Sequence, residues 1–111
     1  MKHQMNLRND PFEKIKCGTK TVEMRLCDDK RKAINVGDTI LFTNVGTKEQ
    51  LLVEVVDLKT FATFDELYLQ YDKVAIGYDA GDCANPKDML FYYTAEQIAK
   101  YGVVAISVKV C

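Results

Sequence analysis

Apolar residues occupy every second position in several short stretches of the chain, and this period is typical of β-strands. In residues 103–110, aliphatic side chains stand at all four even positions, which predicts a final strand. Shorter alternating or apolar runs predict further strands at residues 5–7, 20–26, 39–43 and 51–58. The chain is therefore expected to be built largely from short strands.

The first predicted helix is bounded by residues that cap exposed backbone groups. Asp10 as the N-cap and Pro11 at the first helical position predict its start, and Gly18 predicts its end about two turns later. In residues 28–33 acids are followed by bases, the order that the helix dipole favours, which predicts one further helical turn.

Two capping boxes predict two more short helices. Thr63 with Glu66, and Thr94 with Gln97, have the spacing at which a side chain and the backbone satisfy each other at a helix start. Between these helices, residues 72–90 show no periodicity and contain several Gly, Asp and Pro positions. A long irregular segment in a small domain is often functional, so we expect a rim or lid over a pocket.

The elements follow the order β-α-β-turn-β-β-α-loop-α-β. Few of the strands are joined by helices of the length that parallel pairing uses. We therefore expect an α+β fold, a small and mostly antiparallel β-barrel with flanking helices. At 111 residues the chain is long enough for one core and too short for two, so residues 1–111 are expected to form a single domain.

The composition, with 48% hydrophobic and 28% charged residues, is that of an ordinary globular protein. No apolar run approaches the roughly 20 residues that span a bilayer, and no apolar signal core follows Met1. We therefore expect a cytoplasmic location without membrane contact. The four cysteines form no C-x-x-C pair and the only histidine lies apart from them in sequence, so neither a metal nor a cofactor is expected.

Charge is distributed unevenly along the chain. Residues 1–32 carry nine Lys/Arg and five Asp/Glu, a net charge of +4, whereas residues 33–111 carry a net charge of −5. A basic first third on an acidic chain indicates a local anion-binding face, with chance clustering on a solvated face as the alternative. It does not favour nonspecific binding of long polyanions, which needs a broad basic surface.

The densest group of polar side chains is the sequence GTKTVEMR at residues 18–25, where the first helix gives way to a strand. The period of two places Glu23 and Arg25 on one face, with Thr21. Arg25 either pairs with a carboxylate or receives a phosphate or a base edge. Glu23 either neutralises this arginine or acts as a base, and two adjacent cations would lower its pKa and so favour binding. Lys20 can hold a phosphate or act as a base or nucleophile, and its alternative is an ordinary solvated lysine.

The same stretch, together with DPF at residues 10–12, resembles the ASCH-domain family. The signature of that family is G-x-K-x-x-E-x-R, and its fixed positions are here Gly18, Lys20, Glu23 and Arg25. The likeness extends to VGD at residues 36–38 and YGV at residues 101–103, so that it covers nearly the whole chain. The resemblance implies a fold similar to the PUA superfamily, with a cleft beside the signature.

The resemblance also implies a class of partner. PUA-like domains commonly bind RNA, and ASCH domains are proposed to bind or act on RNA or modified nucleosides. Some small bacterial members that resemble this chain are amidohydrolases that remove an acyl group from N4-acetylcytidine, using the signature lysine, a threonine and a glutamate. Here Glu23 occupies the threonine position and residues 67–95 contain no glutamate. The acids available to replace it are Asp72, Asp79 and Asp82.

Three functions are therefore expected, in this order. The first is binding of RNA, a nucleotide or a nucleoside in a cleft beside the signature. Its binding residues would be Lys20, Thr21, Arg25, Tyr92 and Tyr101, the tyrosines by stacking on a base. The second is a small hydrolase, of the N4-acetylcytidine amidohydrolase or ribonuclease-like type, in which Lys20 and Glu23 are catalytic. The third is a protein-interaction domain in which the motif only braces the barrel. Whether the chain is an enzyme stays open on the sequence.

Overall fold

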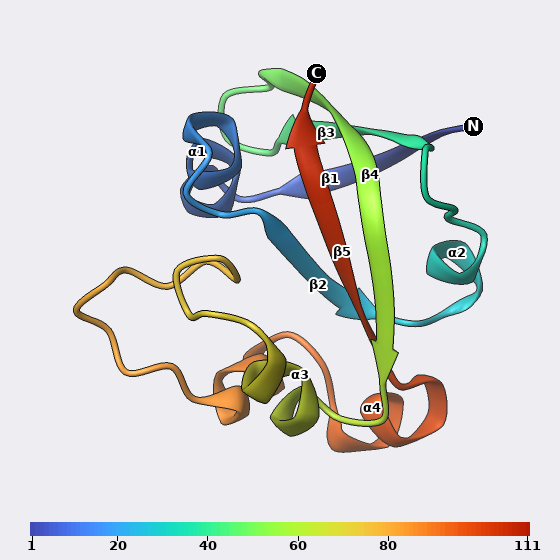
Figure 1. The fold of residues 1–111 in the computed structure, drawn as a ribbon, viewed down its shortest axis with the longest axis vertical. Helices are drawn as coiled ribbons and strands as arrows, with labels where there is room; N and C mark the ends of the chain where they lie inside the picture. Colours follow the sequence, from blue (N-terminus) through green and yellow to red (C-terminus); the bar gives the residue numbers. More distant parts are fainter.

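The structure, a computed structural model, describes residues 1–111 as one five-stranded sheet surrounded by short helices (Figure 1). In chain order the elements are β1 (Lys2–Leu7), α1 (Asn9–Cys17), β2 (Val22–Leu26), α2 (Asp29–Lys32), β3 (Thr39–Asn44), β4 (Gln50–Phe61), α3 (Phe64–Gln70), the 3₁₀ helix η1 (Pro86–Phe91), α4 (Ala95–Tyr101) and β5 (Val103–Val110). None of the helices has both the length and the apolar composition needed to cross a membrane.

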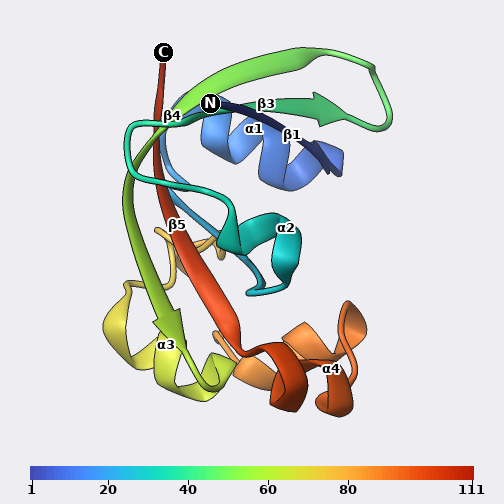
Figure 2. The ribbon, with the colours of Figure 1, turned by 90° about the vertical axis from the view of Figure 1, so that its right-hand side faces the viewer.

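The strands form a mixed sheet in the order β1-β3-β4-β5-β2. β1 runs parallel to β3, and every other neighbouring pair is antiparallel. β1 and β2 are the two edges and do not pair with each other, so the sheet is a half-barrel with an open seam. Figure 2 shows this sheet curling over α1. The predicted α+β fold, a mostly antiparallel curled sheet with flanking helices, is confirmed, and its single parallel pair is the element that the sequence did not indicate.

Each face of the sheet carries its own apolar core. On the concave face, Phe12 and Ile15 of α1 pack with strand residues such as Phe42 and Ile106. On the opposite face, α3 and the segment after it cover β2 and one side of β5. Because β5 contributes to both cores, residues 103–106 are all buried. A fully buried large apolar side chain contributes roughly 1.5–3 kcal/mol, so these two cores hold the half-barrel together without a closed ring of strands.

The two predicted capping boxes both lie at helix starts. Thr94 and Gln97 form the complete box at the start of α4. At the start of α3, the Thr63 hydroxyl accepts a hydrogen bond from the backbone N–H of Glu66 at 3.2 Å, but the Glu66 side chain does not bond back to Thr63, so only half of the predicted box forms. The sequence therefore positions these helices correctly, including the threonine that begins each one.

The start of α1 differs from the prediction. The helix begins at Asn9, with Arg8 at the N-cap and no side-chain cap, so the prediction of Asp10 as the N-cap is wrong. Asp10 lies in the first turn, where Lys14, one turn later, forms an ion pair with it at 3.1 Å. The predicted end is confirmed, since Gly18 adopts a left-handed φ of +88° after the last turn.

Three strands differ clearly in length from the prediction, and the first of them, β1, begins at Lys2, three residues before its predicted start. β2 begins at Val22, because the N–H groups of Thr21 and Val22 both donate to the Ala75 carbonyl at 3.0 Å instead of joining the sheet. β4 continues to Phe61, past its predicted end, since a bulge in residues 55–57 shifts the register and lets β5 pair with it further. The contact at Ala75 brings the irregular segment after α3 against the edge of β2.

Candidate functional site

Lys20, Glu23 and Arg25 form one ion-pair network, called here the triad. Lys20 Nζ donates to Glu23 Oε1 at 2.8 Å, and Arg25 Nε donates to Glu23 Oε2 at 2.9 Å. Arg25 Nη2 also lies 2.8 Å from Glu23 Oε2. Each carboxylate oxygen of Glu23 thus contacts a cation, and Lys20 and Glu23 are only 7% and 4% exposed.

The alternation of β2 places Glu23 and Arg25 on the concave face of the sheet, whereas Lys20 lies just before the strand. In the register of β2 and β5, Glu23 lies opposite Ile106 and Arg25 lies opposite Val104. Both of these partners belong to the concave core. The two charged residues therefore share a face, as predicted, but this face is turned into the half-barrel, and Glu23 is buried as a consequence.

Electrostatics keep Glu23 ionised in spite of its burial. Burial by itself raises the pKa of Glu23, because a carboxylate is poorly solvated inside a protein. The positive charges and hydrogen bonds of Lys20 and Arg25 act in the opposite direction and prevail, so the pKa of Glu23 lies below its usual range. An ionised carboxylate between two cations is a weak proton acceptor. The arrangement therefore suits a binding network better than a general base.

Arg25 also links the two edge strands across the open seam. Its Nη2 group donates to the carbonyl oxygen of Asn6, in β1, at 2.9 Å. The planar guanidinium can serve Glu23 and this carbonyl together because its donors form a fixed fork. The guanidinium thus joins the sheet edges where no strand pairing exists, and the triad has a structural role in addition to any binding role.

A cleft of about 790 Å³ opens beside the triad, which forms its floor. One wall consists of the end of β1 and the start of α1. The opposite wall comes from α3, from residues 76–78 and from residues 87–93. This second wall is strongly aromatic, and its rings belong to Tyr68, Tyr78, Phe91, Tyr92 and Tyr93. A concave space of this volume with a few polar groups at its floor is typical of a small-ligand site.

Hydrogen bonds and ring contacts fix the inner part of the aromatic wall. The Tyr68 and Tyr78 hydroxyls share a hydrogen bond at 2.9 Å, and the Tyr78 hydroxyl donates to Asp88 Oδ2 at 2.7 Å. Burial, together with these two neighbours, raises the pKa of Tyr78, so this hydroxyl stays protonated. Tyr93 stacks on Phe64 with ring centroids 6.1 Å apart and an interplanar angle of 13°. These rings are thus held in place before any ligand binds.

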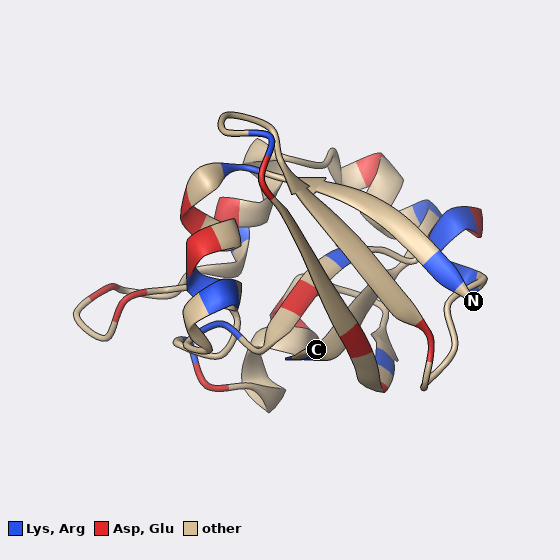
Figure 3. Cartoon of the chain, turned by 90° about the horizontal axis from the view of Figure 1, so that it is seen from above, with Lys and Arg blue, Asp and Glu red and all other residues tan.

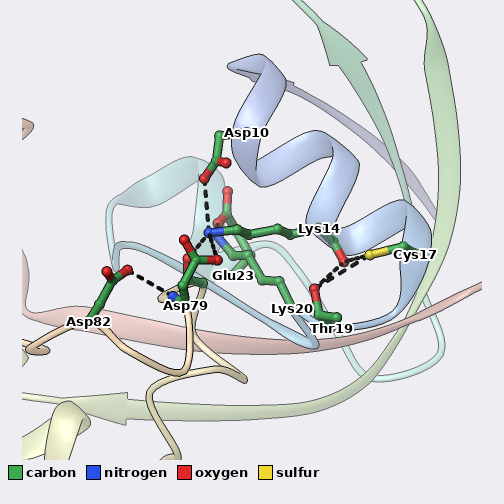
Figure 4. A network of polar contacts seen from close by, with 9 residues as sticks. Asp10, Lys14, Cys17, Thr19, Lys20, Glu23, Asp79 and Asp82 are labelled. Atoms are coloured by element: carbon green, nitrogen blue, oxygen red, sulfur yellow. Dashed lines mark hydrogen bonds and ion pairs between the residues drawn. The ribbon is translucent and has the colours of Figure 1, made fainter.

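Lys14 fastens the irregular segment to α1. Its Nζ group donates to the Gly77 carbonyl at 2.8 Å and forms ion pairs with Asp10 at 3.1 Å and Asp79 at 3.3 Å (Figure 4). Gly77 has a φ of +115°, and a Cβ atom there would lie 3.2 Å from Lys20 Cδ. Only glycine fits this position without displacing the triad lysine. After Gly77, the loop that contains Asp79 and Asp82 projects from the body of the protein (Figure 3).

The charged groups that line the cleft are unequally partnered. Its three carboxylates, Asp10, Glu23 and Asp88, each have a cation or a hydroxyl as a partner. Two cations in the lining, Arg8 and Lys87, form no ion pair. The Tyr78 hydroxyl does not neutralise Asp88, so the groups of the lining outside ion pairs are Arg8, Lys87 and Asp88, with a net charge of +1, which favours an anionic ligand.

The predicted binding residues fall into two groups. Lys20, Arg25 and Tyr92 line the cleft. Thr21 lies outside it and lines a smaller depression of about 360 Å³ that Lys20 also borders. Tyr101, at the end of α4, also lies outside the cleft and packs against the core on the opposite face of the sheet. The structure therefore brings together three of the five residues.

The acid in the aromatic wall of the cleft is not one of the three that the sequence offered in place of the family's glutamate. Asp72, Asp79 and Asp82 lie outside the lining, whereas Asp88 belongs to it. The sequence analysis identified neither Asp88 nor Tyr93 as a site residue. Asp88 lies in the aperiodic residues 72–90 and Tyr93 just after them, where no pattern shows which side chains turn inward. No group of three or more His, Cys, Asp or Glu side chains is arranged to hold a metal ion.

The family model described as "ASCH domain" matches residues 5–111. The chain belongs to the ASCH family. Its half-barrel is accordingly the PUA-like fold of that family. The match includes the whole triad and both walls of the cleft, and no curated protein matches the chain.

Solved structures similar to this ASCH domain support the same fold. The crystal structure of hypothetical protein PH0355 is 31% identical, with a TM-score of 0.84 and 100% of both chains covered. The solution NMR structure of protein PF0455 from Pyrococcus furiosus is 30% identical, with a TM-score of 0.76 and coverage of 99% of this chain and 97% of that one. A mutant of ZmASCH from Zymomonas mobilis is 14% identical, with a TM-score of 0.64 over 97% of this chain and 67% of its own, a likeness of fold alone.

Proposed function

We propose that this ASCH domain binds single-stranded RNA, through a nucleotide unit held in the cleft beside the triad. The observation that carries the proposal is an aromatic-walled cleft of about 790 Å³ in which the charged groups outside ion pairs carry a net positive charge. A nucleotide combines a flat base with an anionic phosphate, and single-stranded nucleic acids are bound by this combination of stacking and basic groups. Membership of a PUA-like family supports the same class of ligand.

The cleft residues have different free groups that can contact the phosphate or the base of a nucleotide. Arg8 and Lys87, which lack ion-pair partners, are placed to hold a phosphate. Tyr93, on the inner wall, offers a ring face or a hydroxyl to a base, and the more exposed Tyr92 lies at the rim. Arg25 uses Nε and Nη2 within the protein, which leaves Nη1 to donate to a base edge or a phosphate oxygen. Glu23 holds this guanidinium by hydrogen bonds, and Lys20 in turn holds Glu23.

A hydrolase that acts on RNA or on an N4-acetylcytidine-type nucleoside is the second candidate. It is favoured by Asp88, an acid in the cleft wall that can replace the missing glutamate. Glu23 is a poor base in the triad, because two cations lower its pKa. A hydrolytic reaction would therefore need Asp88 as the proton acceptor, with Lys20 as the cation beside the reacting group.

Fluorescence anisotropy with a labelled single-stranded RNA hexamer tests the binding proposal. We expect the wild-type protein to bind at low salt, with affinity that falls as salt rises. Lys87→Ala should weaken binding several-fold and reduce the slope of log affinity against log salt by about 0.7, because one phosphate contact is lost. Lys59→Ala removes another exposed lysine, from β4 and outside the cleft, and should leave affinity unchanged. Equal losses in the two variants, or no binding of RNA, nucleotides or nucleosides at low salt, would overturn the proposal.

Chromatography of RNA and of N4-acetylcytidine after incubation with the protein separates binding from hydrolysis. Product that disappears in Asp88→Asn supports the hydrolase, whereas binding without product supports the binding module. The third hypothesis, a motif that only braces the sheet, predicts a different result. In that case Arg25→Ala lowers the melting temperature, and neither binding nor turnover is detected with any of these ligands.

A further inference from the structure

We infer that the rim of the cleft carries a second base-stacking position, formed by Phe91, Tyr92 and Arg8, so that the ligand is a strand of at least two nucleotides. This inference rests on the proposed function and specifies its ligand. An RNA strand would occupy both positions, whereas a free nucleoside or mononucleotide would occupy only the inner part of the cleft.

Phe91 and Tyr92 are exposed aromatic residues without a role in the core. They are 76% and 56% exposed, and neither belongs to the two apolar cores. Their ring centroids are 5.4 Å apart with an interplanar angle of 81°, so the two exposed rings are in edge-to-face contact. Large exposed apolar surfaces that do not stabilise the fold generally mark contact sites. We call this pair the aromatic shelf.

Arg8 extends the shelf from the opposite wall of the cleft. Its guanidinium carbon lies 5.8 Å from the Phe91 ring centroid and 5.6 Å from that of Tyr92, both within the range of a cation–π contact. Arg8 is the N-cap residue of α1, whereas the two rings lie at the end of η1 and just after it. A cation beside two ring surfaces is suited to a stacked base and the phosphate attached to it.

The shelf is separate from the inner aromatic wall. Inside the cleft, Tyr68 and Tyr78 are joined by hydrogen bonds, and Tyr93 is stacked on Phe64. These inner rings pack against the core on the opposite face of the sheet, whereas the shelf does not. Two aromatic platforms in one cleft fit two successive bases, because each base of a flexible single strand can stack independently.

The charges around the shelf favour nucleic acid over a protein segment. Arg8 touches the shelf, Lys87 lies four residues before Phe91 in the same lining, and both cations are unpaired. An apolar peptide would cover the rings but would leave two cations without partners, which is unfavourable when water is excluded. A phosphodiester link between two stacked bases supplies the missing anion.

Competition titrations with uridine monophosphate and with the dinucleotide pUpU test the second position. In the wild-type protein we expect the dinucleotide to bind about 5- to 150-fold more tightly than the mononucleotide, the range for stacking one further base. Phe91→Ala should abolish most of this gain, and Phe91→Tyr should retain it. Leu69→Ala, which truncates an exposed apolar side chain of α3 outside the cleft, should keep the full gain.

The outcomes separate this inference from the function on which it rests. If neither ligand binds, the proposed function fails as well. If both bind with equal affinity in the wild-type protein, the proposed function stands and the second position is refuted. If Phe91→Ala keeps the gain but dissociates an oligomer seen by sedimentation velocity, the shelf is a protein contact surface instead.

Discussion

Glu23→Gln is the sharpest perturbation of the triad. The substitution keeps the size of the side chain but removes the charge that holds Lys20 and Arg25. It also places an amide group, a donor, beside one of two cationic donors, which cannot accept its hydrogen bond. The side chains of Lys20 and Glu23 are almost completely buried, so water cannot replace the lost partner. The variant therefore leaves two neighbouring positive charges without compensation.

The magnitude follows from this burial. Removing one partner of a buried ion pair costs about 3–5 kcal/mol, and because Arg25 is 15% exposed and borders the cleft, we expect the lower end, about 3 kcal/mol. A small domain has a total stability of about 5–15 kcal/mol, so the variant should still fold but unfold at a clearly lower urea concentration.

The pH dependence provides a second, independent signature. The pKa of Glu23 is lower in the folded protein than in the unfolded chain, where it is about 4.3. Its contribution to stability is therefore fully present above that unfolded value and is lost as pH falls through the lower folded-state value. The difference in unfolding free energy between wild type and Glu23→Gln should be constant near neutral pH and shrink in acid.

Urea unfolding followed by circular dichroism over a range of pH measures both effects. The matched control is Glu49→Gln, which removes a carboxylate that pairs with Lys16 at 2.6 Å on the surface. Exposed pairs contribute little, so this control should be close to wild type. If the two variants are equally stable, or if the cost of Glu23→Gln does not decrease in acid, the triad is not the buried network described above.

Three further predictions concern the elements around the triad. Gly77→Ala should lower stability by about 1–3 kcal/mol in urea unfolding, because φ is +115° there and the new Cβ meets the triad lysine. Arg25→Lys should cost about 1.5–3 kcal/mol in the same assay and speed amide exchange at the seam, because the single nitrogen of lysine lacks the planar fork whose Nε and Nη2 bond the two sheet edges. The Thr19 hydroxyl lowers the pKa of the Cys17 thiol, so Thr19→Val should slow alkylation of Cys17 by iodoacetamide, measured by mass spectrometry.

Each of these predictions has an internal control. Gly81→Ala adds a Cβ where no atom lies within 4 Å, and it should be neutral or slightly stabilising. An equal loss in both glycine variants would contradict the account of Gly77. Unchanged exchange at the seam in Arg25→Lys would mean that the cores alone keep the sheet edges together. For the thiol, an alkylation rate that does not change in Thr19→Val would exclude the hydroxyl as the cause.

The sequence predicts local relationships well in this protein. The three triad residues lie within six positions, so a strand period alone places Glu23 and Arg25 on one face. The threonine caps of α3 and α4 are also local, since each depends on a side chain and a backbone group three residues apart. What the period cannot show is which face is covered. Glu23 is buried because β5, about 80 residues later in the chain, places Ile106 beside it.

Relationships between distant segments were missed because the period of a strand or helix does not show which other segment packs against it. The parallel pairing of β1 and β3 was not predicted, because the crossover between them consists of two short helices and β2 itself and does not look like a single crossover helix. The aromatic wall depends on how the aperiodic residues 72–90 fold back, so Asp88 and Tyr93 could not be distinguished from their neighbours. Tyr101 was predicted as a stacking residue because an exposed tyrosine and a core tyrosine look alike in sequence.

The position of β2 at the far edge of the sheet has a consequence for synthesis of the protein. β2 pairs only with β5, so residues 22–26 have no strand partner until residues 103–107 have been translated. Contacts between such distant segments form slowly, because a long loop must close first. The core that Val22, Met24 and Leu26 join also contains Val103 and Ala105 of β5, so it stays incomplete until that strand has been translated. We therefore expect this domain to fold only after its last strand leaves the ribosome, and nascent chains that end before it to depend on chaperones.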